Sequence, residues 1–239
     1  METVDGGTAL PVVKGFALDL ERKEALQLVR QRQAMPTGRQ GAPRQDAWIE
    51  AVDRAADEAL RLVRPAIAYD TFPVTAAEPS RLIVGDGHPL ESPVVASLFA
   101  RAPEVVLMVF TIGPLLEERV AALGNSGDYP VAFALDIAGS VMLGKAGEVG
   151  YRIIENMAKA KATKASIPLN PGTSHWPMSG QRLIAELVGA GEIGVEARES
   201  GVLHPFKSIA FAVALGDDVL TPAEGSSCDY CDRRDLCRA

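Results

Sequence analysis

The sequence has few cysteines, no excess of basic residues and no long apolar run, and each absence excludes a class of protein. Its three cysteines all lie within the last twelve residues, which fits a reducing compartment better than a disulfide framework. The net charge is −7 and the pI is about 5.1, so the chain lacks the basic face of a general nucleic-acid binder. No apolar run reaches the ~18 residues that a membrane span needs. We therefore expect neither a nucleic-acid nor a membrane partner.

The beginning of the chain also lacks the features of a secretory signal. Residues 1–8 have neither the basic start nor the apolar core of a signal peptide, so we expect a cytoplasmic location. The 239 residues suffice for one large domain, and 47% hydrophobic and 23% charged residues are typical of a globular protein. We expect an N-terminal portion over residues 1–80, a core over 81–220 and a cysteine-containing tail over 221–239.

Hydrophobic periodicity predicts an alternation of helices and strands. The expected helices span 20–33, 46–64, 93–100, 114–124, 130–162 and 177–188, and the expected strands span 11–18, 66–74, 81–84, 105–111, 195–199 and 208–215. The segment 105–111 is almost continuously apolar, which indicates a central strand buried on both faces. We interpret the pattern as an α+β fold with a mixed, mainly antiparallel sheet flanked by helices. A doubly wound parallel sheet is the competing arrangement.

A stripe of mostly small residues runs along the helix expected over 130–162, at Ser140, Gly144, Gly147 and Tyr151. Each glycine costs ~1 kcal/mol inside a helix relative to alanine. The stripe therefore favours the close approach of a strand, or alternatively of a flat ligand. The strand expected over 208–215 has one face of alanines, at Ala210, Ala212 and Ala214, and this face is a candidate partner for the stripe.

The segment 170–173, Asn-Pro-Gly-Thr, predicts a tight turn. Pro171 fixes φ at the first corner, and Gly172 supplies a positive φ at the second. His175 and His204 lie beside prolines in loops that flank this unit. Because loops on a rigid scaffold often carry ligand contacts, both histidines are candidate binding residues.

These motifs resemble the activation domain of cobalamin-dependent methionine synthase, in its short free-standing members. The matching segments are Phe110–Gly113, Leu135–Ser140, Asn170–Gly172, Trp176–Pro177, Ile193–Val195, Glu199–Ser200 and Pro205–Ser208, and the resemblance covers roughly residues 83–239. It implies the fold of that domain and an accessory role in corrinoid-dependent methyl transfer. In this role the protein docks on a cobalamin-binding protein and supports its reductive reactivation with S-adenosylmethionine. Together with the loop histidines, the motifs give six candidate cofactor-binding residues: Asn170, Gly172, Thr173, His175, Glu199 and His204.

The sequence departs from the family's S-adenosylmethionine motif at two positions. The motif has an arginine four residues before the turn glycine and a tyrosine directly after it, where this chain has Pro168 and Thr173. An acidic residue expected in the preceding helix aligns near Gly144. Without the guanidinium, the carboxylate of the ligand has no bidentate partner. We therefore expect a weak or absent S-adenosylmethionine site. The alternative function is a non-enzymatic ligand- or partner-binding module of the same fold.

The cysteine tail predicts a metal centre. Cys228 and Cys231 form a C-x2-C pair, and Cys237 follows six residues after the second cysteine. Three thiolates favour either a zinc site completed by a histidine or an iron–sulfur cluster with an external fourth ligand. A disulfide or three inert thiols is the alternative. An iron–sulfur cluster here could pass an electron to a corrinoid cobalt, whereas cobalamin itself would be bound only by the partner protein.

Other functional classes find less support in the sequence. A metal-dependent hydrolase could use His175, His204 and Glu199, but no two of these residues have HExxH-like spacing. His88 lies in an expected turn over 85–88, which favours a solvated loop histidine over a ligand. Whether the chain is itself an enzyme stays open. If the chain is an enzyme, we expect it to act as part of a cobalamin-dependent methionine synthase or methyltransferase system.

Overall fold

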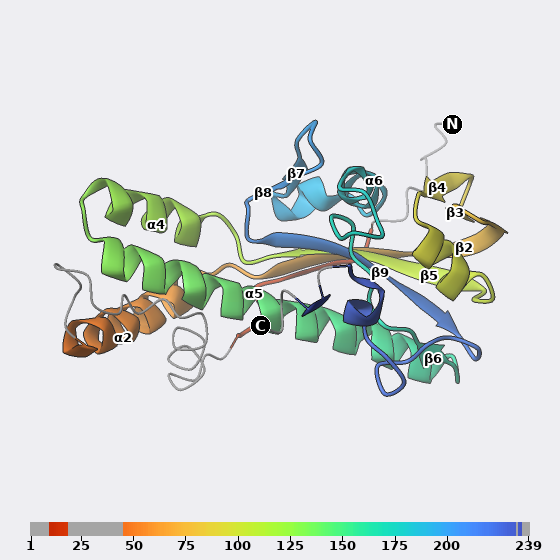
Figure 1. The fold of residues 1–239 in the computed structure, drawn as a ribbon, viewed down its shortest axis with the longest axis horizontal. Helices are drawn as coiled ribbons and strands as arrows, with labels where there is room; N and C mark the ends of the chain where they lie inside the picture. Colours follow the sequence, from red (N-terminus) through yellow and green to blue (C-terminus); the bar gives the residue numbers. More distant parts are fainter. Residues whose placement is uncertain (1–9, 19–44, 233, 236–239) are drawn as a thin grey trace, which may run out of the picture.

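The computed structural model describes residues 10–18, 45–232 and 234–235 (Figure 1). Within these residues, the chain builds a seven-stranded sheet in the order β4-β3-β2-β5-β9-β6, with β1 paired to β2. Its strands are β1 Val12–Lys14, β2 Ala66–Glu78, β3 Arg81–Val84, β4 His88–Leu90, β5 Glu104–Thr111, β6 Lys164–Ala165 and β9 Ser208–Gly216. Each of these pairings is antiparallel, which confirms the predicted fold class.

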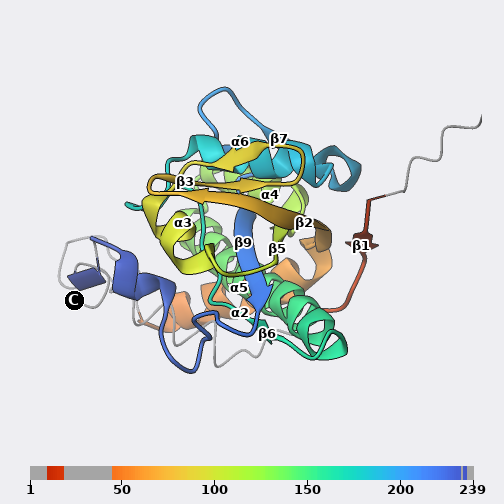
Figure 2. The same cartoon turned by 90° about the vertical axis from the view of Figure 1, so that its right-hand side faces the viewer.

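Helices cover both faces of the sheet (Figure 2). They are α2 Gln45–Leu62, α3 Pro93–Phe99, α4 Leu115–Asn125, α5 Tyr129–Ala160 and α6 Ser179–Leu187, with the 3-10 helices η1 Ala190–Ile193 and η2 Ser227–Tyr230. One core cluster joins α2, α4 and α5 to the sheet, and the other joins α3, α6 and η1 to the opposite face. A separate hairpin, β7 Glu196–Ala197 and β8 Leu203–His204, follows η1. None of the described helices combines the length and the apolar character needed to cross a membrane.

Strand β5 is buried on both faces, as its apolar run predicts. Val105, Leu107 and Val109 face the core of α3 and α6. Val106 and Met108 face the core of α2, α4 and α5. The long helix is confirmed too, because α5 begins at Tyr129 with a proline in its first turn and continues to Ala160. The helix expected over 20–33 lies outside the described residues.

Of the two glycines in the predicted stripe of α5, Gly147 packs against a strand, but not against the predicted one. A Cβ on Gly147 would lie 2.9 Å from Phe110 Cζ, and a Cβ on Gly150 would lie 2.6 Å from Met108 Sδ. Gly147, and Gly150 outside the predicted stripe, thus make room for two bulky side chains of β5. The expectation that the stripe meets the alanine face of β9 is wrong, because that face belongs to the core of α3 and α6. Gly144 has no atom near its missing Cβ.

Tertiary pairing changed several predicted boundaries. His88 was expected in a turn, but it begins β4 and pairs with Val84. Strand β2 extends to Glu78 because β3 pairs with its second half. The strand expected over 195–199 is reduced to Glu196–Ala197. Each of these differences depends on a partner strand, which local sequence patterns do not encode.

Candidate functional site

The segment 170–176 forms a compact turn at the edge of β9. Leu169 pairs with Ala212 through two backbone hydrogen bonds, which fixes the chain just before the turn. Gly172 has the expected positive φ, +92°, and its N–H donates to the carbonyl of Trp176 at 2.9 Å. The Thr173 hydroxyl donates back to the Asn170 carbonyl at 2.8 Å. The turn is therefore held by its own hydrogen bonds as well as by β9.

The Asn170 side chain has a structural partner. Its amide donates to the Ala210 carbonyl at 3.2 Å, so it fastens the turn to β9. Gln181 on α6 donates to the carbonyl of Pro171 at 3.1 Å. Of the four predicted site residues in this segment, Gly172 is the one classed as exposed. A ligand at this turn would therefore meet mainly backbone, with the Thr173 hydroxyl already engaged.

His175 lies at the centre of the turn region. Its carbonyl accepts a hydrogen bond from the Ser92 hydroxyl at 2.7 Å, and its ring lies 3.2 Å from Thr173 Oγ1. Burial lowers the pKa of His175, and a hydrogen bond with the Tyr230 backbone and the charge of Asp232 oppose this shift only in part. The imidazole is therefore neutral at pH 7. A neutral imidazole can donate at one nitrogen and accept, or bind a metal, at the other.

The cysteine tail docks against this turn. The N–H of Asp232 donates to the Ser174 hydroxyl at 3.0 Å, and the Tyr230 backbone contacts the His175 ring. Helix η2 begins with a capping box between Ser226 and Asp229, which orders the segment that carries the first cysteine. The structure thus brings together two sequence-predicted features that lie more than fifty residues apart.

The two described cysteines are accessible free thiols on this tail. Cys228 is exposed, Cys231 is half-buried, and the N–H of Cys231 donates to the Cys228 carbonyl. Cys237, the third predicted ligand, lies outside the described residues. Among the described side chains, no three of His, Cys, Asp and Glu converge in a way that could hold a metal.

Glu199 and His204 belong to a second group, on the β7–β8 hairpin. Glu199 is exposed near Arg182 of α6, and His204 packs edge-to-face on Phe206 with ring centroids 6.0 Å apart. Met178 lies between this hairpin and the turn, because the missing Cβ atoms of Gly172 and Gly201 would both approach it. The contacts of Glu199 and His204 are thus separate from those of His175. They do not form the ligand set that a metal-dependent hydrolase would need.

A polar cluster that the candidate residues did not include lies on the other side of β9. Lys207 Nζ bonds to Asp136 Oδ1 at 2.7 Å and to Ser140 Oγ at 3.0 Å, both on α5. The Lys207 carbonyl accepts from the Ile112 N–H and the Thr111 hydroxyl. The side chain of Lys207 is only 15% exposed, so this charge is specifically held. The sequence did contain a sign of this cluster, because its residues belong to three of the segments that match the family.

A loop beside this cluster presents an exposed aromatic ring. Phe206 is 64% exposed, and its N–H donates to the Glu117 carboxylate on α4 at 2.9 Å. The guanidinium of Arg198 lies 5.9 Å from the Phe206 ring centroid, within the range of a cation–π contact. An exposed aromatic ring next to a cation is a common feature of protein-binding surfaces.

Comparisons with known proteins support the fold alone. A scan against protein-family models finds no match, and a search of curated proteins finds none either. Among solved structures, the chain is similar to the MetH reactivation domain bound to AdoHcy, with a TM-score of 0.52 and 12% identity. The alignment covers 87% of this chain and 79% of that chain. The described residues therefore adopt the fold of a methionine synthase reactivation domain.

Proposed function

We propose that this chain is an accessory protein of corrinoid-dependent methyl transfer, which docks on a cobalamin-binding protein and supports its reductive reactivation. The observation that carries the proposal is the similarity of fold to the MetH reactivation domain over 87% of the chain. The Lys207 cluster adds support. The matching segments that contain Ile112, Asp136 and Lys207 are distant in sequence, yet they meet there through hydrogen bonds and an ion pair.

In this proposal the turn binds S-adenosylmethionine weakly or not at all. Pro168 offers no side-chain donor for a carboxylate, and the Thr173 hydroxyl already bonds to the Asn170 carbonyl. Loss of a charge-assisted bidentate contact costs on the order of 2–5 kcal/mol. We therefore expect calorimetry to detect no micromolar binding of S-adenosylmethionine. Micromolar binding would contradict this expectation and would direct attention to backbone contacts at Gly172.

The cysteine tail supplies the redox part of the proposal. Cys228, Cys231 and Cys237 would together hold one metal centre, zinc or iron–sulfur, and an iron–sulfur cluster could pass one electron to the cobalt of the partner. The contact between Asp232 and Ser174 supports a tail that is held against the domain rather than free. Metal analysis of anaerobically purified protein should find about one zinc, or iron with acid-labile sulfide, per chain. The triple Cys→Ser variant should lose it.

The reactivation role is tested with a separately produced cobalamin-binding protein in its cobalt(II) state. Visible absorption follows the loss of cobalt(II) under a low-potential chemical reductant, with and without the present protein. We expect the reduction to be faster with the protein, and slower again with the triple Cys→Ser variant if the centre carries the electron. An unchanged rate with intact protein would contradict the proposal.

Docking is measured separately from reduction, with the exposed aromatic as the probe. Phe206→Ser should weaken binding of the cobalamin-binding protein. Tyr129→Ser is the matched control, because Tyr129 is similarly exposed, at 68%, but lies at the start of α5. Equal effects of both substitutions would place the docking surface elsewhere.

A second candidate is a non-enzymatic binding module of the same fold. Pro168 and Thr173 favour it, because they replace the two ligand contacts that the family motif provides. In the same experiments, this candidate predicts binding of the partner protein without any change in the rate of cobalt reduction.

A further inference from the structure

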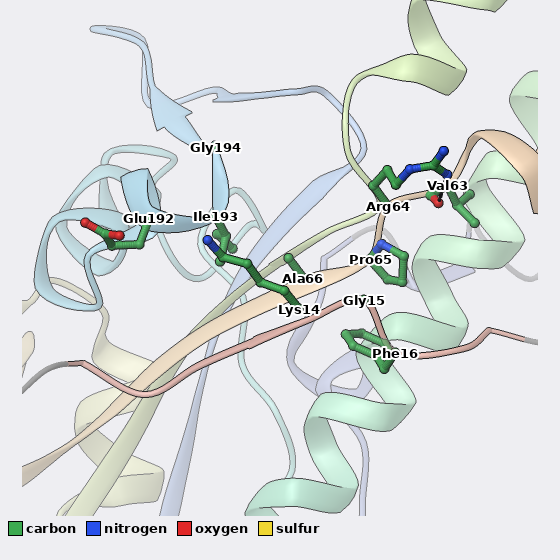
Figure 3. Close-up of a pocket in the computed structure, with 10 residues that line it drawn as sticks. All are labelled: Lys14, Gly15, Phe16, Val63, Arg64, Pro65, Ala66, Glu192, Ile193 and Gly194. Atoms are coloured by element: carbon green, nitrogen blue, oxygen red, sulfur yellow. Dashed lines mark hydrogen bonds between the residues drawn. The ribbon is translucent and has the colours of Figure 1, made fainter.

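A cavity of about 580 Å³ opens where β2 begins (Figure 3), and neither the turn nor the tail contributes to its lining. Three chain segments line it: residues 14–16 of β1 and its extension, residues 63–66 between α2 and β2, and residues 192–194 at the end of η1. Its volume lies within the range of about 300–1,000 Å³ that is typical of small-molecule sites. No part of the proposed function uses this cavity.

The walls of the cavity combine apolar and polar groups in nearly equal measure. Phe16, Val63, Pro65, Ala66 and Ile193 contribute apolar side chains. Gly15 and Gly194, with φ of +68° and +73°, also line it, and a Cβ on either would meet no atom within 4 Å. These two glycines therefore leave open space at the cavity. Such a site would accept a flat apolar group.

One positive charge at the cavity has no partner in the part of the chain that the structure describes. Lys14 extends from β1 towards η1 in Figure 3, and it forms no hydrogen bond or ion pair with the described residues. The other cation, Arg64, donates to the carbonyls of Arg61 and Val63 at the end of α2, and its guanidinium points away from the cavity. Glu192 also points away. The Lys14 ammonium is thus the charge that a ligand would meet.

A second cavity provides the contrast. It measures about 440 Å³ and is lined by Arg101 and Asp218. Here the cation is already neutralised, because Arg101 Nη1 lies 2.6 Å from Asp218 Oδ2. An unpaired ammonium attracts an anion more strongly than a paired guanidinium does, since no counter-charge has to be displaced.

We propose that the cavity beside Lys14 binds a small organic anion with a flat apolar body and one acidic group, such as a carboxylate, sulfonate or phosphate. The apolar side chains of the cavity would pack against the body of the ligand, and the ammonium of Lys14 would pair with its acidic group. This assignment is independent of the cobalamin role, so either can fail without the other.

Two fluorescent probes of the same shape test the proposal. Anilinonaphthalene sulfonate carries an anionic group on an apolar aromatic body, and N-phenylnaphthylamine has the same body without the charge. Titration at low salt should give saturable binding of the sulfonate to the full-length protein. Lys14→Gln should weaken the sulfonate by about three- to tenfold, the size expected for one charge-assisted contact, and should leave the neutral probe unchanged.

The matched variants separate the site from general charge effects. Lys14→Arg should retain sulfonate binding, and Arg101→Gln, which removes one positive charge at the second cavity, should leave it unchanged. Lys14 is exposed on the short strand β1, so its substitution should not unfold the protein, which circular dichroism checks. The proposal is overturned by an absence of saturable sulfonate binding, by equal affinities of the Lys14→Gln and unsubstituted proteins, or by an equal loss in Arg101→Gln.

Discussion

Substitution of Gly201 by alanine should destabilise the protein markedly, because two separate costs meet at this residue. Gly201 lies in the β7–β8 hairpin with φ of +85°, where an alanine is strained by roughly 1–2 kcal/mol. Its Cβ would also lie 2.5 Å from the carbonyl oxygen of Met178, a backbone atom at the start of α6. Overpacking of this kind typically costs about 1–3 kcal/mol. We therefore expect a total loss of about 2–5 kcal/mol.

The chain offers a close control for the backbone part of this cost. Gly127 has φ of +84°, but a Cβ there would meet no atom within 4 Å. Gly127→Ala should thus cost only the strain of roughly 1–2 kcal/mol. Urea denaturation of the two variants measures the difference, which is the cost of the contact with Met178. If the two free energies of unfolding agree within about 0.5 kcal/mol, the hairpin does not rest on α6 as described.

Two further predictions concern partly buried polar groups. Because burial lowers the pKa of His175, the folded protein binds fewer protons than the unfolded one between that lowered pKa and the usual value of about 6.5. The free energy of unfolding should therefore fall as the pH drops through this window. The urea midpoint of His175→Gln should fall less over the same range. Parallel curves of midpoint against pH for the two proteins would contradict this. Lys207→Met should cost about 1–3 kcal/mol, because it removes the charge-assisted contacts of a largely buried ammonium with Asp136 and Ser140. Loss of the exposed Arg101 ion pair should cost no more than about 1 kcal/mol. Similar losses in both variants would show that Lys207 contributes no more than a surface pair.

The long elements with a clear hydrophobic pattern were predictable from the sequence. The run 105–111 and the helix from residue 129 were found because burial on two faces and amphipathic spacing leave local signatures. The element that packs against the glycines of α5 was not predictable. Gly147 and Gly150 indicate only that another group approaches the helix closely. That group is Phe110 for Gly147 and Met108 for Gly150, and the pairing depends on how α5 is positioned along β5.

The candidate site was predictable in its turn but not in its surroundings. Pro171 and Gly172 determine a local backbone shape, so the turn at 170–173 follows from residue chemistry. The contact between Asp232 and Ser174 spans 58 residues, and no local rule links a backbone N–H to a serine hydroxyl over that distance. The ion pair of Lys207 with Asp136 spans 71 residues. The sequence indicated only that both residues lie in segments that match the family.

Strand β9 connects the parts that the proposed function uses. Lys207, just before it, holds α5, and the Ala210 carbonyl holds Asn170 of the turn. Because β9 is paired along its length with the central strand β5, these two attachments belong to a rigid element. The tail differs, since in its described residues it reaches the turn through the Asp232–Ser174 hydrogen bond and the Tyr230–His175 contact. Regions with few buried contacts open most readily. A substitution at the cysteines should therefore weaken the contacts of the tail with Ser174 and His175 more readily than it changes the conformation of the turn itself.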